Sequence, residues 1–359
     1  MFDKMVQGMI YMGLPAVAGY HLICGNIFLN TAAEDAEGFE KAGNIVLAPV
    51  QFILAGKVAI LDQGQYKIEQ QYDYHHQLPL KSTAAIFSLP LSLPIGSLLK
   101  GIGYFSETTR LRHDAIKAAL ESKEVHPNVN YYQSLGLSIE SGETLEPPQH
   151  KRRPGEENAL KLEKDLLRDI AHLFKENQIP FWVDCGTCLG AYRYGGAIPW
   201  DLDIDIAILL PDFDNVMHAL NGLDKTKYQV QDWSNRCRPK TYIRVYMYEN
   251  RNFIDIYHFA INPEEKTLKY ILSNEISSFM VDSWIERESR FTVPSSYDTI
   301  FPLRKADFDG IEVYVPNKTK EYLQERYGEN ISPVKLYNEL SGEYEKDLSH
   351  PYWQLPHVY

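Results

Sequence analysis

The central part of the chain switches repeatedly between the two periodicities of regular secondary structure. Over residues 158–175 apolar residues recur at helical spacing, which predicts an amphipathic helix that packs on a sheet. Residues 241–248 and 253–259 instead alternate with a period of two, which predicts two strands joined by a turn at 249–252. A further short strand is predicted at 181–183. Strands and helices intermixed in this way indicate a mixed α/β domain.

The most informative alternation lies at residues 201–208, where acidic and apolar residues take turns. Alternate residues of a strand point to the same face, so we expect three carboxylates on one face and the apolar side chains on the other. Carboxylates this close repel one another unless a cation neutralises them. Hard divalent ions such as Mg²⁺ or Mn²⁺ prefer such oxygen ligands. The acids are Asp201, Asp203 and Asp205, and the apolar residues are Leu202, Ile204, Ile206 and Ile208.

Two more features extend this candidate site. Gly186 and Thr187 precede a predicted helical turn at 189–194, and the free N–H groups at such a helix start attract phosphate. Asp255 lies between two isoleucines, and on a strand beside the acidic one it would complete a carboxylate cluster. A Gly-Thr turn, a strand with paired acids and a later single acid together resemble the nucleotidyltransferase superfamily.

The N-terminal third carries three long uncharged runs, at residues 5–33, 45–56 and 82–99. The first is long enough to span a bilayer but is interrupted by glycines. The third contains Pro90 and Pro94, which fit a re-entrant or interfacial hairpin better than a straight span. Three such runs close together favour membrane association, and the alternative is that all three form the core of a soluble N-terminal domain.

Residues 141–157 are rich in proline, glycine and charge, which predicts a linker between an apolar region at 1–140 and a catalytic domain at 158–359. A small basic patch at 150–153 either contacts anionic lipid or is solvated. The net charge of −12 argues against a general nucleic-acid binder, which would need a basic face. We therefore expect no nucleic-acid partner.

Further motifs make the resemblance more specific. GTCLGAYR at 186–193, IPWDLDIDIAI at 198–208, the IDI around Asp255, FPL at 301–303 and VPNKTKEYLQERYG at 315–328 stand in the order expected of the LicD/fukutin family. The resemblance implies a nucleotidyltransferase-like catalytic domain that uses Mg²⁺ or Mn²⁺. It also implies transfer of phosphocholine or a polyol phosphate from a CDP-linked donor to a glycan hydroxyl.

Two cysteines depart from the family pattern. Cys188 stands where a leucine is expected, and Cys185 where a tyrosine or a small residue is usual. The CxxC that they form lacks further zinc ligands at suitable spacing. Buried structural thiols and a redox pair are the two interpretations.

Within the site, Asp203 and Asp205 are the expected metal ligands, and Asp201 is either a third ligand or an acceptor that orients one. Asp255 is either a metal ligand or the general base that takes the proton of the acceptor hydroxyl. Arg193 matches the family arginine and is expected to hold a phosphate, with a surface salt bridge as the alternative.

Aromatic and basic residues flank the acids. Arg244 shares a predicted strand face with two tyrosines and is a candidate for contact with the donor diphosphate. Trp200 either stacks on the donor base or supports the turn as core. Aromatic rings also bind quaternary ammonium groups, so a choline cage competes with ordinary strand packing. The cage candidates are Tyr242, Tyr246, Tyr257 and Trp182.

Three functions follow from these patterns. The first is a LicD-type phosphotransferase that modifies a cell-surface or lipid-linked glycan, associated with a membrane through its N-terminal third and with its catalytic domain on the cytoplasmic side. The second is another enzyme of the nucleotidyltransferase fold that transfers a nucleotide to a small molecule or protein. The third is an inert adaptor or membrane scaffold. The C-terminal motifs favour the first, and the complete acid set argues against the third.

Overall fold

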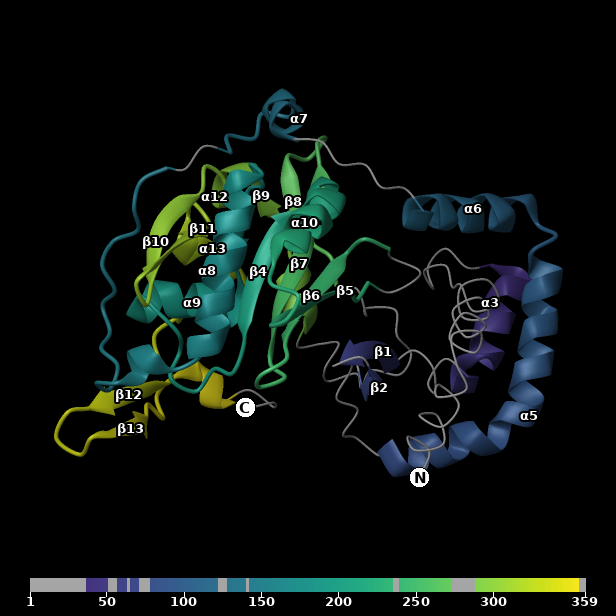
Figure 1. The fold of residues 1–359 in the computed structure, drawn as a ribbon, viewed down its shortest axis with the longest axis horizontal. Helices are drawn as coiled ribbons and strands as arrows, with labels where there is room; N and C mark the ends of the chain where they lie inside the picture. The colour runs from purple at the N-terminus through teal and green to yellow at the C-terminus, as the bar shows by residue number, and fades with distance from the viewer. Residues whose placement is uncertain are drawn as a thin grey trace. The chain divides into compact units, whose positions relative to one another are not determined.

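The computed structural model describes residues 37–50, 57–62, 65–70, 78–121, 128–139, 142–234, 239–272 and 288–354. These residues fall into two compact units (Figure 1). The first unit holds the described residues up to Glu121, and the second holds those from Asn128 onward apart from Pro239. Every residue predicted for the candidate site lies in the second unit.

The first unit is built around a pair of helices in close contact. The helices pack tightly because glycine stands where they meet, and a side chain at Gly96 would overlap Leu47. The buried Glu40 accepts a hydrogen bond from Arg112, which joins the first of its helices to the last. The elements are α3 (Gly38–Val46), the antiparallel hairpin of β1 (Lys57–Asp62) and β2 (Gln65–Gln70), α5 (Leu78–Gly103) and α6 (Glu107–Glu121).

The helix α5 corrects one expectation from the sequence. Pro90 and Pro94 lie inside a single continuous helix, so the predicted re-entrant hairpin is wrong. Each proline removes one backbone hydrogen bond, which bends a helix more readily than it ends one when the flanking residues continue in helical conformation. Among the described residues, Thr83–Gly103 is the one helix long and apolar enough to cross a membrane. The predicted run at 5–33 lies outside the described residues.

The second unit contains a mixed sheet in which strand order and sequence order differ. Its main path runs β3-β4-β7-β6-β5, while β8 pairs with the second half of β7 and β9 pairs with β8. The pair β4–β7 is parallel and the other pairs are antiparallel. The strands are β3 (Phe181–Val183), β4 (Ile204–Leu209), β5 (Tyr228–Asp232), β6 (Tyr242–Met247), β7 (Phe253–Asn262), β8 (Thr267–Tyr270) and β9 (Ser295–Ser296).

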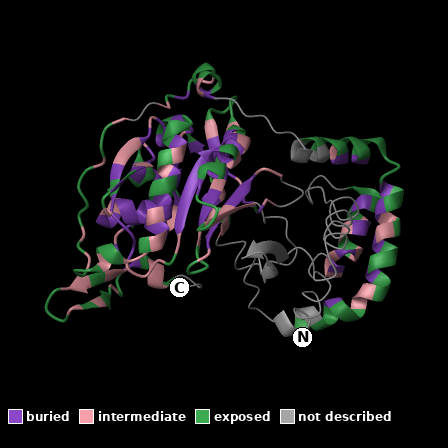
Figure 2. Cartoon of the chain, in the orientation of Figure 1, coloured by how far each residue is buried: buried purple, intermediate pink, exposed green. Residues whose placement is uncertain are grey.

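Helices cover this sheet, and β4 is buried along its whole length. All six residues of β4 are buried, as Figure 2 shows along the length of the strand. The apolar stripe of α8 packs on β4 and β7, as the helical spacing predicts, and α10 lies beside α8. The helices are α7 (Val129–Ser134), α8 (Lys161–Glu176), α9 (Cys185–Tyr194), α10 (Phe213–Ala219), α12 (Tyr297–Ile300) and α13 (Thr319–Tyr327).

Two small hairpins and several short 3₁₀ turns complete the unit. The first hairpin turns at Asp309-Gly310, where both residues have positive φ, as a type I′ turn requires. The hairpins pair β10 (Arg304–Phe308) with β11 (Ile311–Val315) and β12 (Lys335–Asn338) with β13 (Glu343–Lys346). The 3₁₀ turns are Glu156–Asn158, Leu210–Asp212, Leu220–Gly222, Arg290–Thr292 and Pro351–Gln354. The predicted mixed α/β architecture is therefore confirmed.

Candidate active site

A row of charged residues crosses the centre of the sheet. Asp205 on β4 is paired in register with Asp255 on β7, which is paired in turn with Arg244 on β6. Residues that face each other across a ladder project to the same side, so these three side chains share one face. The alternation of acidic and apolar residues predicted this placement of Asp255 correctly, because both acids lie in regular strands.

The other two acids precede the strand instead of lying on it. The strand β4 begins at Ile204, so Asp201 and Asp203 belong to the segment from Gly195 to Asp203, here called the acidic loop. Leu202 is 79 % exposed, so the prediction that it fills the core face is wrong. The alternation of sheet faces cannot hold before the first ladder pair, which is Ile204 with Ile254.

Charge repulsion and burial dominate the electrostatics of these acids. Burial and the charge of Asp203, with which it shares a hydrogen bond, raise the pKa of Asp201 to about 7. Burial and the charge of Asp255 raise the pKa of Asp203. Burial, Asp203 and Asp255 raise the pKa of Asp205 well above its ordinary value. None of the three acids forms an ion pair within the described part of the chain, so their charge is left uncompensated.

The start of α9 contacts the acids from the side. A side chain at Gly186 would overlap the Asp201 carboxylate, so glycine is what allows this acid to pack against the helix. The hydroxyl of Thr187 accepts a hydrogen bond from the backbone N–H of Asp205, at 2.8 Å. The helix starts at Cys185, whose φ of 47° lies in the left-handed region. Gly186 and Thr187 thus shape the acid cluster itself, in addition to their predicted role at a phosphate.

Asp255 differs from the other acids because it has its own cation. Arg244 donates from Nε to Asp255 Oδ1 at 2.6 Å and from Nη2 to Oδ2 at 2.9 Å, and Nη2 also reaches the hydroxyl of Tyr242. The guanidinium carbon lies 4.2 Å from the ring centre of Trp233 and 3.5 Å from that of Phe253. Arg244 is therefore fixed in a buried bidentate ion pair between aromatic rings.

The predicted choline cage does not form as proposed. Tyr242 and Tyr257 stack on each other with ring centres 5.2 Å apart. Trp182 is fully buried against Phe259 and Phe301, so it belongs to the core and is wrong as a cage member. The sequence alone could not exclude Trp182 from the cage. Trp182 pairs with Ala207, so it shares the sheet face of Asp205 but lies further along the strands, inside the core.

Arg193 and Trp200, both predicted to contact the CDP-linked donor, lie in different surroundings from each other. Arg193 is buried and donates to the backbone carbonyls of Ile331 and Ser332, each at 2.7 Å, while its assignment to a donor phosphate stays a prediction. Trp200 is partly exposed in the acidic loop, with Tyr344 edge-on to its ring and the Lys335 ammonium 4.9 Å from its ring centre.

The two cysteines of the CxxC motif are free thiols. Burial and the charges of Asp184 and Asp205 raise the pKa of Cys185 well above its ordinary value, and burial with Asp184 does the same for Cys188. Because the thiolate is the reactive form, these surroundings favour the structural interpretation over a redox pair.

One acid of the neighbourhood escaped the sequence reasoning. Asp184 is buried at the N-terminus of α9 and accepts a 2.6 Å hydrogen bond from the hydroxyl of Tyr322 on α13. Arg326, one turn further along α13, stacks on the Tyr322 ring. These contacts explain why the motif at 315–328 accompanies the acids. The signal in the sequence was Tyr322, a tyrosine on the buried face of a helix, whose hydroxyl needs a polar partner.

The carboxylate oxygens of the acid cluster are ligands that suit a hard divalent cation. Among the described residues no three His, Cys, Asp or Glu side chains converge on one point. Mg²⁺ commonly binds only one or two protein carboxylates and completes its shell with water and substrate phosphates. Asp203 and Asp205, which have no cation within the described chain, fit that pattern. Asp255, which Arg244 already neutralises, fits it less well.

The comparison with protein families bears on this arrangement. Residues 178–318 match the family model described as LicD/FKTN/FKRP, nucleotidyltransferase domain. These residues form a LicD-family domain. The predicted resemblance to the LicD/fukutin family is therefore confirmed over residues 178–318, here called the LicD domain, which contain Asp184, Asp201, Asp203, Asp205 and Asp255.

Relatives of the LicD domain include both uncharacterized and named proteins. A protein of Rickettsia prowazekii (strain Madrid E), described as uncharacterized, is 30% identical over 188 residues, which cover 50% of this chain and 62% of that protein. The mouse ribitol-5-phosphate transferase FKTN is 27% identical over 181 residues, 49% of this chain and 34% of its own length. The mouse ribitol 5-phosphate transferase FKRP is 22% identical over 175 residues, which cover 48% of this chain and 32% of FKRP. The chain thus covers less than two thirds of each of these relatives.

Proposed function

We propose that this protein is a metal-dependent transferase that moves a polyol phosphate from a CDP-linked donor to a hydroxyl of a glycan. The observation that carries the proposal is the uncompensated acid cluster of the LicD domain, Asp201, Asp203 and Asp205, beside an Asp255 that has its own cation. The names of the mouse relatives, which are ribitol-phosphate transferases, support a phospho-alcohol as the group transferred.

A polyol is favoured over choline by the position of Arg244. Its guanidinium already lies against the faces of Trp233 and Phe253, where a quaternary ammonium group would have to bind. A second cation placed there would be repelled by the first. Polyol hydroxyls need hydrogen-bonding groups instead, and tyrosine hydroxyls are present on the same face at Tyr242 and Tyr257.

The proposed roles follow from the contacts of each side chain. Asp203 and Asp205 hold Mg²⁺ or Mn²⁺, which supplies charge stabilisation for the diphosphate. Asp201 packs against Gly186 and shares a hydrogen bond with Asp203, so it orients that ligand. Both oxygens of Asp255 accept from Arg244, so an acceptor hydroxyl would compete with a guanidinium for them. We therefore propose that Asp255 positions or ligates the ion, and that it is not the general base.

The fold supports this assignment without adding a second function. The parallel pair β4–β7 holds Asp205 and Asp255 side by side within a mixed sheet. We also propose that α5 brings the protein to a membrane, where lipid-linked acceptors lie, with the LicD domain on the cytoplasmic side. Protease accessibility of sealed membrane vesicles tests that orientation.

The deciding experiment uses the full-length protein in detergent. It is incubated with Mg²⁺ or Mn²⁺ and with CDP-ribitol, CDP-glycerol or CDP-choline, and CMP release is measured beside Asp203→Ala. Metal-dependent release from a polyol donor, absent in the variant, supports the proposal. Preferential use of CDP-choline contradicts the polyol assignment. Pyrophosphate release from a nucleoside triphosphate, with no CDP donor consumed, replaces the proposal by nucleotide transfer, and silence from every donor and triphosphate favours the adaptor.

A further inference from the structure

The acidic loop, residues 195–203, leaves α9 and delivers Asp201 and Asp203 to the site without any ladder hydrogen bond of its own. Within the loop, the backbone N–H of Asp201 donates to the carbonyl of Ile198 at 2.9 Å, which forms a single turn. The position of the loop must therefore be set by groups outside it. Because metal ligands need positions accurate to a fraction of an ångström, whatever sets this loop also sets the site.

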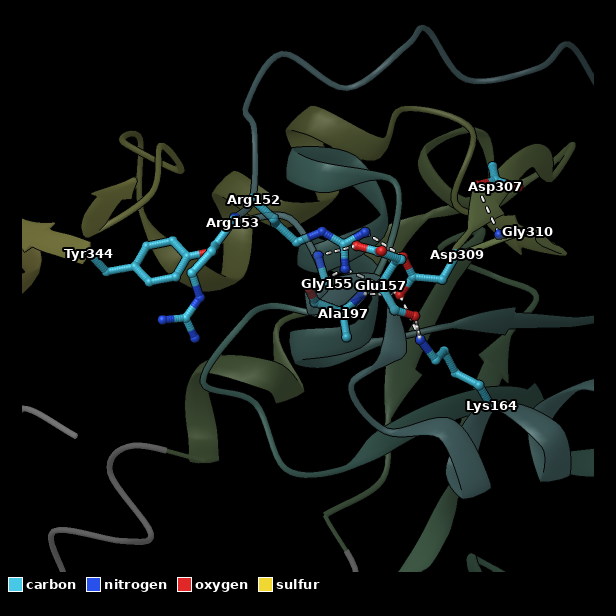
Figure 3. Close-up of polar contacts among 10 residues, drawn as sticks. All are labelled: Arg152, Arg153, Gly155, Glu157, Lys164, Ala197, Asp307, Asp309, Gly310 and Tyr344. Atoms are coloured by element: carbon cyan, nitrogen blue, oxygen red, sulfur yellow. Dashed lines mark hydrogen bonds and ion pairs between the residues drawn. The ribbon is translucent and has the colours of Figure 1, made fainter. Parts of the chain in front are cut away.

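Those groups come from two distant parts of the chain (Figure 3). Asp309, at the β10–β11 turn, accepts from the backbone N–H of Ala197 at 3.2 Å, and its own N–H donates to the carbonyl of Gly195 at 2.8 Å. Arg152, from the predicted linker, donates to the carbonyl of Ala197 at 3.1 Å. A side chain at Gly196 would overlap the Asp309 carboxylate, so the contact depends on glycine there.

Buried charges join the β10–β11 turn to residue 152 and to α8. Arg152 forms a bidentate pair with Asp309, and Lys164 on α8 donates to Asp309 Oδ2 at 3.1 Å. The side chains of Arg152, Lys164 and Asp309 are 12%, 7% and 2% exposed. Burial opposes ionisation of Asp309, but the two cations outweigh it and lower its pKa. Arg152 therefore neither contacts lipid nor is solvated, which corrects both interpretations of the basic patch at this residue.

This cluster has features that stability alone does not require. A buried charge network is a costly way to fasten a surface hairpin, because apolar residues of similar volume stabilise as well or better. Such a network does fix geometry, since each hydrogen bond to a charged group is directional. Three of its hydrogen bonds end on the backbone of the acidic loop, one at Gly195 and two at Ala197, and not on the elements that the network joins.

We propose that Arg152, Lys164 and Asp309 form a clamp that positions the acidic loop, so that Asp201 and Asp203 are held beside Asp205 for metal binding. Asp309 is the central positioning residue, because it alone contacts both cations and the loop backbone. The inference rests on the proposed function for its purpose and on the contacts of the clamp for its geometry.

The test compares three variants of the full-length protein. Asp309→Asn removes the charge that joins the clamp. Asp307→Asn is the matched control, since Asp307 lies in the same hairpin and is exposed, and its carboxylate accepts from the backbone N–H of Gly310 and from no other group of the described residues. Gly196→Ala displaces the Asp309 carboxylate from the loop while keeping every charge. It takes the place of Asp309→Asn as the test variant if Asp309→Asn does not fold. Circular dichroism establishes folding before each measurement.

Two readouts separate positioning from simple stability. Hydrogen exchange of the metal-free protein is expected to rise in residues 196–204 of Asp309→Asn and Gly196→Ala, but not in β6 or α10. The Mn²⁺ dissociation constant, measured from free Mn²⁺ by electron paramagnetic resonance, is expected to rise by about tenfold or more in both, as for other residues that orient metal ligands. Asp307→Asn is expected to match the wild type in both readouts.

Either of two results overturns the clamp: a folded variant with wild-type loop exchange and Mn²⁺ affinity, or exchange that rises equally across the unit, which indicates a purely structural role. A wild type that binds Mn²⁺ but consumes no CDP donor refutes the proposed function, while the clamp is still judged on exchange and affinity. A wild type that binds no Mn²⁺ overturns both.

Discussion

At the scale of single residues, the site is divided into a compensated and an uncompensated half. Asp255 has Arg244, whereas Asp201, Asp203 and Asp205 have no ion-pair partner among the described residues. A carboxyl whose pKa is higher in the folded than in the unfolded protein reduces stability at any pH above the unfolded value, because the unfolded chain releases its proton more easily. Asp201, Asp203 and Asp205 therefore oppose folding at neutral pH, as expected of groups kept for binding.

We predict that Asp205→Asn stabilises the metal-free protein while abolishing transfer. Burial and the neighbouring acids raise the pKa of Asp205, so its carboxylate is unfavourable in the folded protein, and we expect the variant to unfold at a higher urea concentration than the wild type. Urea unfolding in EDTA measures the gain. Adding Mg²⁺ should then stabilise the wild type more than the variant. A variant that unfolds at lower urea than the wild type contradicts the prediction.

Arg244→Lys is predicted to keep the charge but lose the geometry of the pair. Lysine cannot donate to both oxygens of Asp255 from one planar group or stack on Trp233 and Phe253. We expect a loss of about 1–3 kcal/mol in stability, the usual scale for a hydrogen bond to a charged group. Arg304→Lys, whose partner Glu146 is exposed, is the matched control and should change stability by less than about 1 kcal/mol. Equal effects in the two variants would disprove a special role for the buried pair.

His258 gives the second unit an acid sensitivity independent of the site. It is fully buried on β7 beside Phe213, and burial lowers its pKa to about 3. The unfolded chain binds the proton near pH 6.5, so stability is complete above that pH and falls as the pH drops toward 3.

The prediction for His258 concerns the difference between two pH values. From pH 7 to pH 5 the wild type should lose about 2 kcal/mol that His258→Leu retains, at about 1.4 kcal/mol per pH unit below 6.5. Urea unfolding at both pH values measures it. His172→Leu, at an exposed position on α8, should behave like the wild type. Parallel pH profiles for the wild type and His258→Leu would show that burial does not control this histidine.

Sequence reasoning located site residues wherever regular strands fixed the direction of the side chains. Asp205, Asp255 and Arg244 share a face because period-two alternation holds along paired strands. It failed at Leu202, which precedes the ladder, and it did not predict the hydrogen bonds of Arg193 to backbone carbonyls 138 and 139 positions away. Contacts of a side chain with distant backbone leave no periodic pattern, and Asp309 was missed for the same reason.

At the scale of elements, α5 is the clearest departure from expectation. The prolines indicated a hairpin, yet the segment continues as one helix with exposed apolar side chains along it. The helix offers those side chains to an apolar environment, which keeps membrane association as a proposal for this unit. They include Phe87, Leu91 and Leu98, at 80%, 68% and 65% exposure.

The double variant Phe87→Ser and Leu91→Ser is predicted to weaken association with phospholipid vesicles. Each side chain contributes about 1.5–3 kcal/mol when fully buried in apolar surroundings, so a loss of at least about tenfold in partitioning is expected. Flotation of the full-length protein with vesicles measures it. Leu340→Ser, at a 99% exposed leucine of the second unit, is the control and should float like the wild type. Unchanged flotation of the double variant would remove α5 from the proposed membrane contact.

At the scale of the whole molecule, the local sequence pattern predicted helices and strands, but it did not predict the side-chain contacts between distant segments. The predicted strands at 181–183, 241–248 and 253–259 are present as β3, β6 and β7, with ends shifted by a few residues. The amphipathic helix predicted at 158–175 is present as α8. The hydrogen bonds of Arg152 to Ala197 and Asp309, in contrast, join chain segments far apart in sequence. No local period encodes these contacts, so structure was needed to find them.

The parallel pairing of β4 with β7 also bears on how the protein is made. The fully buried β4 leaves the ribosome well before β7, and everything from Leu210 to Asn252 must be synthesised before its partner exists. At the usual rate of roughly 5–20 residues per second, an apolar strand that can pair only with β3 waits for some seconds. During this interval the nascent chain is exposed to aggregation, and a holding chaperone would be of most use to it there.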